Sequence, residues 1–231
     1  MNAVVRPWRF WGGAALWGSI WLALLAGAIV LSVLAGLHSR LPGDVDISEW
    51  VQGSLFPGMG VSRLVRAVGS TEVVLGTGAV VAVALWLMGW RRQALLLALG
   101  LLVLPFLQHG LKQLVDRPRP TPDLVELRAG FSSPSFPSGH VMSAALLYGL
   151  LLYLSLRIAL PSVLRLALIG WCAFMLVVSG PANVYVGVHW PSDVVGGYAW
   201  AAVLLLPLVY ADQVMEDQSK IQPPTPLHTH H

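Results

Sequence analysis

Charged residues are scarce in this sequence. Asp, Glu, Lys and Arg together make up 11% of its 231 residues, against roughly 25% in soluble domains. Apolar residues make up 56%. A chain with so few charges cannot cover a water-exposed surface, which excludes an ordinary soluble domain and indicates that lipid is the solvent.

Cysteine is also rare, and basic residues do not cluster. The single Cys172 excludes an internal disulfide framework, and its apolar surroundings in the sequence are typical of a small buried side chain. The formal charge is only +3, with no basic stripe and no aromatic residues interleaved with the arginines. Nucleic acid is therefore not an expected partner, whereas membrane lipids are.

Long apolar runs fill most of the chain instead. Several approach the ~20 residues that an α-helix needs to cross a ~30 Å hydrocarbon core. The first run is too long for the apolar part of a signal peptide, and we interpret it as a retained span. We predict six spans, at about residues 11–37, 71–90, 94–111, 140–156, 163–179 and 193–210.

These spans predict an all-α fold, a bundle of six transmembrane helices that forms one domain over residues 1–211. The polar tail at 212–231 contains three prolines and is expected to be disordered. Between the first two spans, four apolar residues follow a helical spacing, at Val61, Leu64, Val65 and Val68. They predict a short amphipathic helix on the membrane surface, with a loop packed over the helix ends as the alternative.

Short loops that carry arginine and no acid indicate the cytoplasmic side. Arg91 and Arg92 lie in one such loop, and Arg157 and Arg165 flank another. The segment 112–139 also carries basic residues, but a bound ligand would account for them. We therefore expect both termini in the cytoplasm and a site that faces the periplasm or exterior of the plasma (inner) membrane.

Three polar segments interrupt the apolar pattern. They read Lys-Gln-Leu-Val-Asp-Arg-Pro-Arg-Pro at 112–120, Pro-Ser-Gly-His at 137–140 and His-Trp-Pro-Ser-Asp at 189–193. Six spans place these segments at the end of the third span, the start of the fourth and the start of the sixth. All three then lie on one membrane face, which predicts a common site.

The last segment contains a histidine and a carboxylate at helical spacing. His189 and Asp193 are four residues apart, so both side chains can lie on one helix face. A carboxylate that holds one imidazole nitrogen leaves the other free as a nucleophile or base. A purely structural hydrogen bond at a helix cap is the alternative.

The middle segment is typical of an anion site at a helix start. Ser138 and Gly139 offer a hydroxyl and an accessible backbone amide, and the helix amino terminus attracts an anion. His140 follows where it could donate a proton to a leaving oxygen. Ordinary helix capping by serine and glycine is the simpler alternative.

The first segment supplies cations. Lys112 and Arg119 could bind phosphoryl oxygens, and Arg117 could join them. Side chains that anchor a helix end at the membrane surface are the alternative, which suits Lys112 better than Arg119. No cluster of metal ligands is visible in the sequence, so we expect neither a metal nor another cofactor.

Taken together, the three segments resemble the signature blocks of the type 2 phosphatidic acid phosphatase family, whose site is related to that of vanadium haloperoxidases. The resemblance rests on Lys112 with Arg-Pro at 119–120, on Pro-Ser-Gly-His, and on Gly-Val-His-Trp-Pro-Ser-Asp at 187–193, in that order. It implies a metal-independent lipid phosphate or pyrophosphate phosphatase that works through a phosphohistidine. A haloperoxidase is not expected, because membrane spans surround the motifs.

The resemblance also implies roles for individual residues. His189 would attack phosphorus, Asp193 would orient it, and His140 would protonate the departing group. The phosphoryl oxygens would be held by Lys112, Arg119, Ser138 and the amide of Gly139. The substrate would be a lipid phosphate, with phosphatidate, phosphatidylglycerol phosphate, undecaprenyl pyrophosphate and lipid A phosphate as candidates.

One position departs from the family pattern. The third block normally carries an arginine six residues before its histidine, and this sequence has Asn183 there. Asparagine can donate a hydrogen bond to phosphate but supplies no charge, and one lost transition-state donor costs roughly 2.7–4 kcal/mol. We therefore expect a weakened site unless Arg117 or a substrate contact fills the gap. A non-catalytic protein that binds or moves a lipid phosphate is the alternative.

Overall fold

The computed structural model describes residues 13–221, with side chains to residue 216. This part of the chain forms eight helices and no strand, which confirms the predicted all-α bundle. The helices are α1 (Ala14–Leu37), α2 (Asp44–Gly53), α3 (Gly58–Val68), α4 (Thr71–Leu87), α5 (Arg91–Val115), α6 (Gly139–Arg157), α7 (Ser162–Tyr185) and α8 (Pro191–Ile221).

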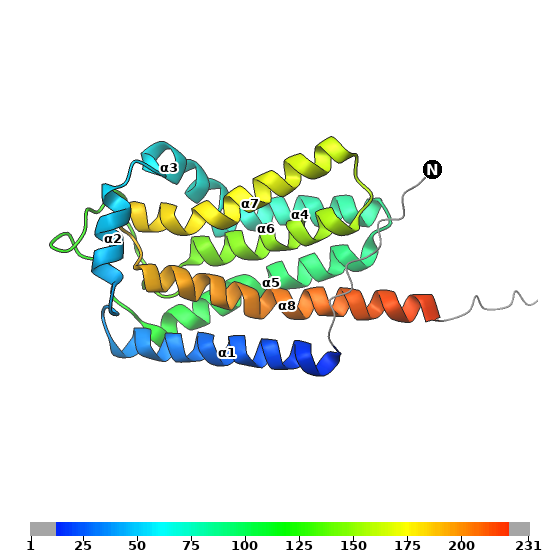
Figure 1. Ribbon diagram of the computed structural model, residues 1–231, viewed down its shortest axis with the longest axis horizontal. Helices are drawn as coiled ribbons and strands as arrows, with labels where there is room; N and C mark the ends of the chain where they lie inside the picture. Colours follow the sequence, from blue (N-terminus) through cyan, green and yellow to red (C-terminus); the bar gives the residue numbers. More distant parts are fainter. Residues whose placement is uncertain (1–12, 222–231) are drawn as a thin grey trace, which may run out of the picture.

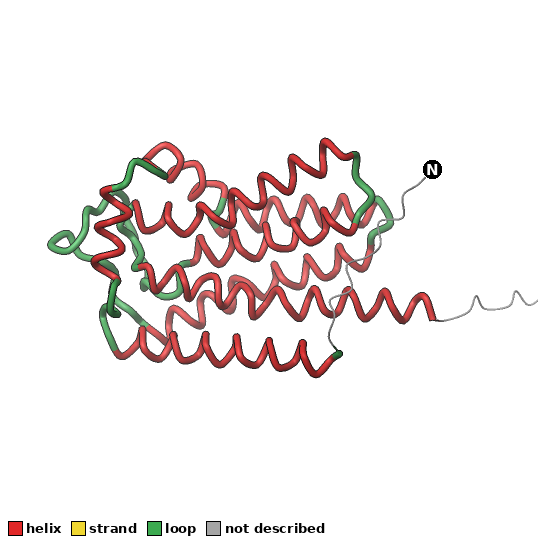
Figure 2. The backbone as a smooth tube through the Cα atoms, in the orientation of Figure 1, coloured by secondary structure: helices red, strands yellow, loops and turns green. Residues whose placement is uncertain are grey.

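The long helices run side by side, and α2, α3 and the long loop after α5 gather at one end of the bundle (Figures 1 and 2). The central helix is α6, which contacts α4, α5, α7 and α8. Within its apolar stretch, 67% of the residues are buried, a larger share than in the other long helices. The first residues of α6 are therefore fixed by neighbours on several sides, which matters because Pro-Ser-Gly-His leads into them.

Five helices are long and apolar enough to cross a membrane, namely α1, α5, α6, α7 and α8. The second predicted span coincides with α4, which has only 17 residues. It qualifies as a sixth span when joined to α3 across a bend of 54°. The protein is thus a multi-pass membrane protein with five such helices in its described part, or six if the bent pair α3–α4 counts as one span.

The segment between α1 and α4 differs in part from the prediction. The amphipathic element is helical, as α3, but it packs against α7, with Val65 buried at the contact side. Helix α2 was not predicted at all. It begins at Asp44, directly after Gly43, whose φ of 85° lets the chain turn into the helix.

Helix α8 continues past the expected end of the last span to Ile221. Buried Asp212 joins three helices there, since it accepts hydrogen bonds from Arg92 Nε (2.7 Å), Gln93 Nε2 (2.9 Å) and Tyr153 Oη (2.8 Å). Residues 212–221 of the predicted tail therefore belong to a helix. Residues 222–231 lie outside the described part of the chain.

Candidate active site

The three sequence motifs meet at the end of the bundle that also carries α2 and the loop between α5 and α6. Figure 1 shows the amino-terminal ends of α6 and α8 and the carboxyl-terminal ends of α5 and α7 converging there. The three segments that were predicted to share one membrane face therefore lie together in space.

His189 lies in the tight turn between α7 and α8 and is 2% exposed. The turn depends on Gly187, whose φ is 76° and whose missing side chain leaves room for the carbonyl oxygen of Glu126. A Cβ at position 187 would lie 2.2 Å from that oxygen, so only glycine fits. Close packing at Gly187 thus fixes the backbone that carries His189.

The two imidazole nitrogens of His189 face different neighbours. Nδ1 is 3.6 Å from Asp193 Oδ2, and Nε2 is 3.3 Å from Arg119 Nη1. Burial lowers the pKa of His189 to about 3, with the cations Arg119 and Lys112 adding to the effect and Asp193 opposing it. The ring is therefore neutral at pH 7, and a proton on Nδ1 would leave Nε2 unprotonated, with an N–H of Arg119 directed at it.

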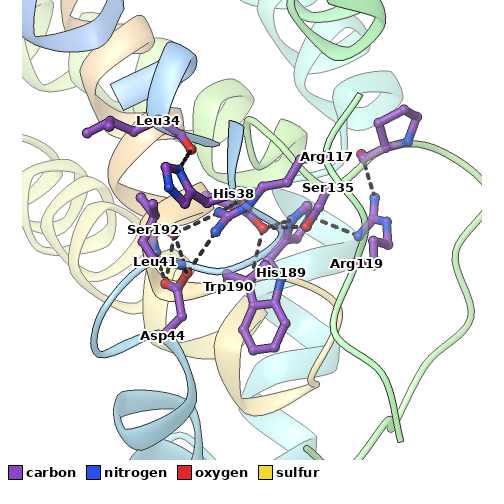
Figure 3. A network of polar contacts seen from close by, with 12 residues as sticks. Leu34, His38, Leu41, Asp44, Arg117, Arg119, Ser135, His189, Trp190 and Ser192 are labelled. Carbon is purple, nitrogen blue, oxygen red and sulfur yellow. Dashed lines mark hydrogen bonds and ion pairs between the residues drawn. The ribbon is translucent and has the colours of Figure 1, made fainter. Parts of the chain in front are cut away.

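Asp193 is fully buried, and its carboxylate is held from several directions. Oδ1 accepts from Arg117 Nη1 at 2.6 Å, while Oδ2 accepts from the Ser135 hydroxyl and, at 2.8 Å, from the Trp190 amide. Figure 3 shows the labelled side chains of Arg117, Ser135, Trp190 and His189 close together in this network. Asp193 is therefore fixed whether or not it also binds His189.

Arg117 occupies a buried position behind the pair instead of facing a ligand. Its Nη2 donates to Asp44 Oδ2 at 2.8 Å, and its Nη1 is shared between Ser192 Oγ and Asp193. Asp44 also accepts from the backbone amide of Ser192 at 3.0 Å (Figure 3). The expectation that Arg117 could join the phosphate-binding cations does not fit these contacts, because both of its terminal nitrogens are occupied.

Arg119 and Lys112 both donate hydrogen bonds to the carbonyl oxygen of Pro134, in the loop before α6. Arg119 is held by the carbonyl oxygens of Ser133 (2.7 Å) and Val188 (2.5 Å), and Lys112 Nζ donates to the carbonyl of Pro134 at 2.5 Å. Burial lowers the pKa of Arg119 to about 10, which leaves it charged at pH 7. Arg119 therefore borders the face of His189 that carries Nε2, and Lys112 is close to Arg119 through their shared carbonyl.

Ser138 and Gly139 begin α6 next to these cations. The Ser138 amide donates to the carbonyl of Asp193 at 3.0 Å, while the buried Ser138 hydroxyl has no hydrogen-bond partner among the described residues. A Cβ at Gly139 would lie 3.9 Å from Lys112 Cε. A buried hydroxyl without a partner, a helix amino terminus and a lysine side by side are the features of an anion site.

His140 is half-buried in the first turn of α6. The charges that act on its ring come from Arg66, Glu72, Arg119 and Lys112. His140 therefore shares its surroundings with the cations of the site.

Asn183 is fully buried in the last part of α7. Its Nδ2 donates to the carbonyl of Ser179 at 2.8 Å, and its Oδ1 accepts a hydrogen bond from Arg66 Nη1. Both ends of the amide are thus engaged. Reading the sequence did not identify Arg66 or Asp44 as members of the site.

Among the described residues, no group of three or more His, Cys, Asp or Glu side chains could hold a metal ion. The independence from metals that the motifs suggest stays a prediction.

The fold and the cluster together define a membrane-embedded helical bundle with a buried His–Asp pair and a candidate anion site at one end. The chain belongs to the PAP2 superfamily, whose sequence model matches residues 93–215. It is 35% identical over 100 residues to phosphatidylglycerophosphatase B of Bacillus subtilis (strain 168), a match that covers 42% of this chain and 47% of that protein.

A solved structure has the same fold. It is the crystal structure of the first transmembrane PAP2 type phosphatidylglycerolphosphate phosphatase from Bacillus subtilis, with a TM-score of 0.69 and 24% sequence identity. The superposition covers 89% of this chain and 98% of that one.

Proposed function

We propose that this protein is a phosphatase that removes phosphate from a membrane lipid through a phosphohistidine at His189. The observation that carries the proposal is the placement of His189, with Nδ1 toward Asp193 and Nε2 toward Arg119. The names of the two similar proteins support a glycerophospholipid substrate, and phosphatidylglycerol phosphate is the first to test.

The reaction divides into two displacements at phosphorus. His189 Nε2 forms a bond to phosphorus while the bond to the lipid oxygen breaks, and His140 gives that oxygen a proton. Water then attacks the phosphohistidine, the phosphorus–nitrogen bond breaks, and His140 takes the proton from water. Lys112, Arg119, Ser138 and the Gly139 amide hold the phosphoryl oxygens in both steps.

Purified protein is expected to release inorganic phosphate from phosphatidylglycerol phosphate, and to do so equally well in excess chelator. Phosphatidate and a polyprenyl pyrophosphate serve as comparison substrates, each presented in the same detergent. Release that stops in chelator and returns with Mg²⁺ would contradict the phosphohistidine scheme. Lipid binding without release from any of the three would favour the non-catalytic alternative, which Asn183 suggested.

We further propose that the site faces the exterior or periplasm of the plasma (inner) membrane, with both termini in the cytoplasm. After the buried Cys172 is replaced by alanine, Ser132→Cys and Met88→Cys provide exposed probes at opposite ends of the bundle. A membrane-impermeant maleimide should label position 132 in intact cells, and position 88 only after permeabilisation. The opposite pattern would invert the topology.

A further inference from the structure

Arg66 lies near the end of α3 on the side that packs against α7. Its Nη1 donates a hydrogen bond to Oδ1 of Asn183, a residue 117 positions later in the chain. Because Asn183 is itself anchored to the carbonyl of Ser179, the guanidinium is held at a defined place.

That place adjoins the site. Gly69, in the turn after α3, lies against the first turn of α6, where a Cβ would be 3.6 Å from the His140 carbonyl oxygen and 3.4 Å from Ala144 Cβ. The charge of Arg66 also reaches Arg119, since it helps burial lower the pKa of Arg119 while Asp193 opposes both. Arg66 therefore lies close enough to Arg119 and His140 for its charge to act on both.

The charge of Arg66 is not balanced by a carboxylate within the described part of the chain. Asn183 is its hydrogen-bond partner there, and no ion pair includes it. Arg117 shows the contrast, because it is buried between two carboxylates. A half-buried guanidinium with a neutral partner, beside two further cations, is suited to an anion that arrives with the substrate.

We propose that Arg66 contacts a phosphoryl oxygen of the bound substrate and supplies the guanidinium that the family pattern places at position 183. Asn183 is then a positioning residue that acts through Arg66. This inference rests on the proposed phosphatase function. It differs from the expectation that Asn183 marks a weakened site, because the missing positive charge would be supplied by Arg66.

Kinetics of Arg66→Gln test the role of the charge. On phosphatidylglycerol phosphate, kcat/KM is expected to fall by about 10²–10³-fold, mostly in kcat, because a donor to the transition-state oxygens is lost. Arg66→Lys should recover only part of the rate, since lysine keeps the charge without the planar pair of donors. The matched control is Arg63→Gln, an exposed arginine on the same helix that should leave kinetics unchanged.

A relocation variant separates the charge from its position. Asn183→Arg alone brings two guanidinium groups together and is expected to lower activity. The double variant Arg66→Gln/Asn183→Arg should be more active than either single variant. A folded Arg66→Gln protein with the kcat/KM of the wild type would overturn the inference while leaving the proposed function intact.

A measurement on the wild type requires neither a folded variant nor turnover. Phenylglyoxal modifies accessible arginines, and mass spectrometry can follow Arg66 and Arg63 separately in the presence and absence of orthovanadate. Vanadate should slow the modification of Arg66 and leave Arg63 unaffected. Equal rates at Arg66 would contradict the inference. Protection without hydrolysis of any lipid would support anion binding at Arg66 and count against the proposed phosphatase.

Discussion

His189→Ala is expected to lower phosphate release by about 10⁴–10⁶-fold, because it removes the atom that forms the bond to phosphorus. The protein should remain folded. Asp193 keeps its hydrogen bonds from Arg117, Ser135 and the Trp190 amide when the ring is gone. Steady-state release of phosphate from phosphatidylglycerol phosphate and the thermal midpoint in detergent measure the two effects separately.

The matched control for this variant is His109→Ala, which removes an exposed imidazole from α5 and should leave turnover unchanged. Trapping adds a direct readout, because a phosphohistidine is labile in acid and stable in base. Substrate labelled at phosphorus should leave such a label on the wild type and none on His189→Ala. Substantial turnover by a folded His189→Ala protein would mean that water attacks the substrate directly.

The long helices were predictable because their signal is local. Length and apolar composition place α1, α5, α6, α7 and α8 close to the expected residues, since each must cross the same hydrocarbon thickness. The bend between α3 and α4 was not predictable in this way, because it depends on how α3 packs on α7. The grouping of the motifs was also predictable, because the order of the spans decides which helix ends share a membrane face.

Helix α2 escaped prediction because distant residues fix it in place. It is short and polar, and its first residue, Asp44, binds Arg117 and Ser192, which lie 73 and 148 positions away. No local pattern marks such a helix. The doublet of arginines in Arg-Pro-Arg-Pro offered a partial signal, since the two side chains have different tasks: Arg117 pairs with buried carboxylates and Arg119 borders His189.

The reading of Asn183 shows the limit of comparing motifs position by position. Such a comparison registers a missing arginine, but it does not register that Arg66, from another helix, donates a hydrogen bond to the Asn183 side chain. The sequence around a lone arginine on an amphipathic helix does not show which motif its side chain will contact in the folded protein. Whether the site is weakened therefore depends on where the charge lies in space.

Asp193→Asn is expected to lower kcat/KM by about 10⁴-fold, the loss seen when a histidine is no longer held in the required tautomer by its carboxylate. It should also destabilise the protein by roughly 1–3 kcal/mol, because an amide cannot accept from all the donors around Asp193. If its oxygen accepts from Arg117, its NH₂ group faces the Trp190 amide and the Ser135 hydroxyl.

The variant Asp44→Asn separates the effect of Asp193→Asn on kcat/KM from its effect on stability. Asp44 is also buried and also binds Arg117, but it has no contact with His189. Asp44→Asn should therefore lower the thermal midpoint in detergent to a similar extent while kcat/KM falls far less. If both variants lowered kcat/KM by the same factor, the contribution of Asp193 would be to hold Arg117 and α2 in place. Orientation of His189 by the Asp193 carboxylate would then no longer explain the rate. A large loss confined to Asp193→Asn requires that the 3.6 Å separation between His189 Nδ1 and Asp193 Oδ2 closes to a hydrogen bond when the substrate binds.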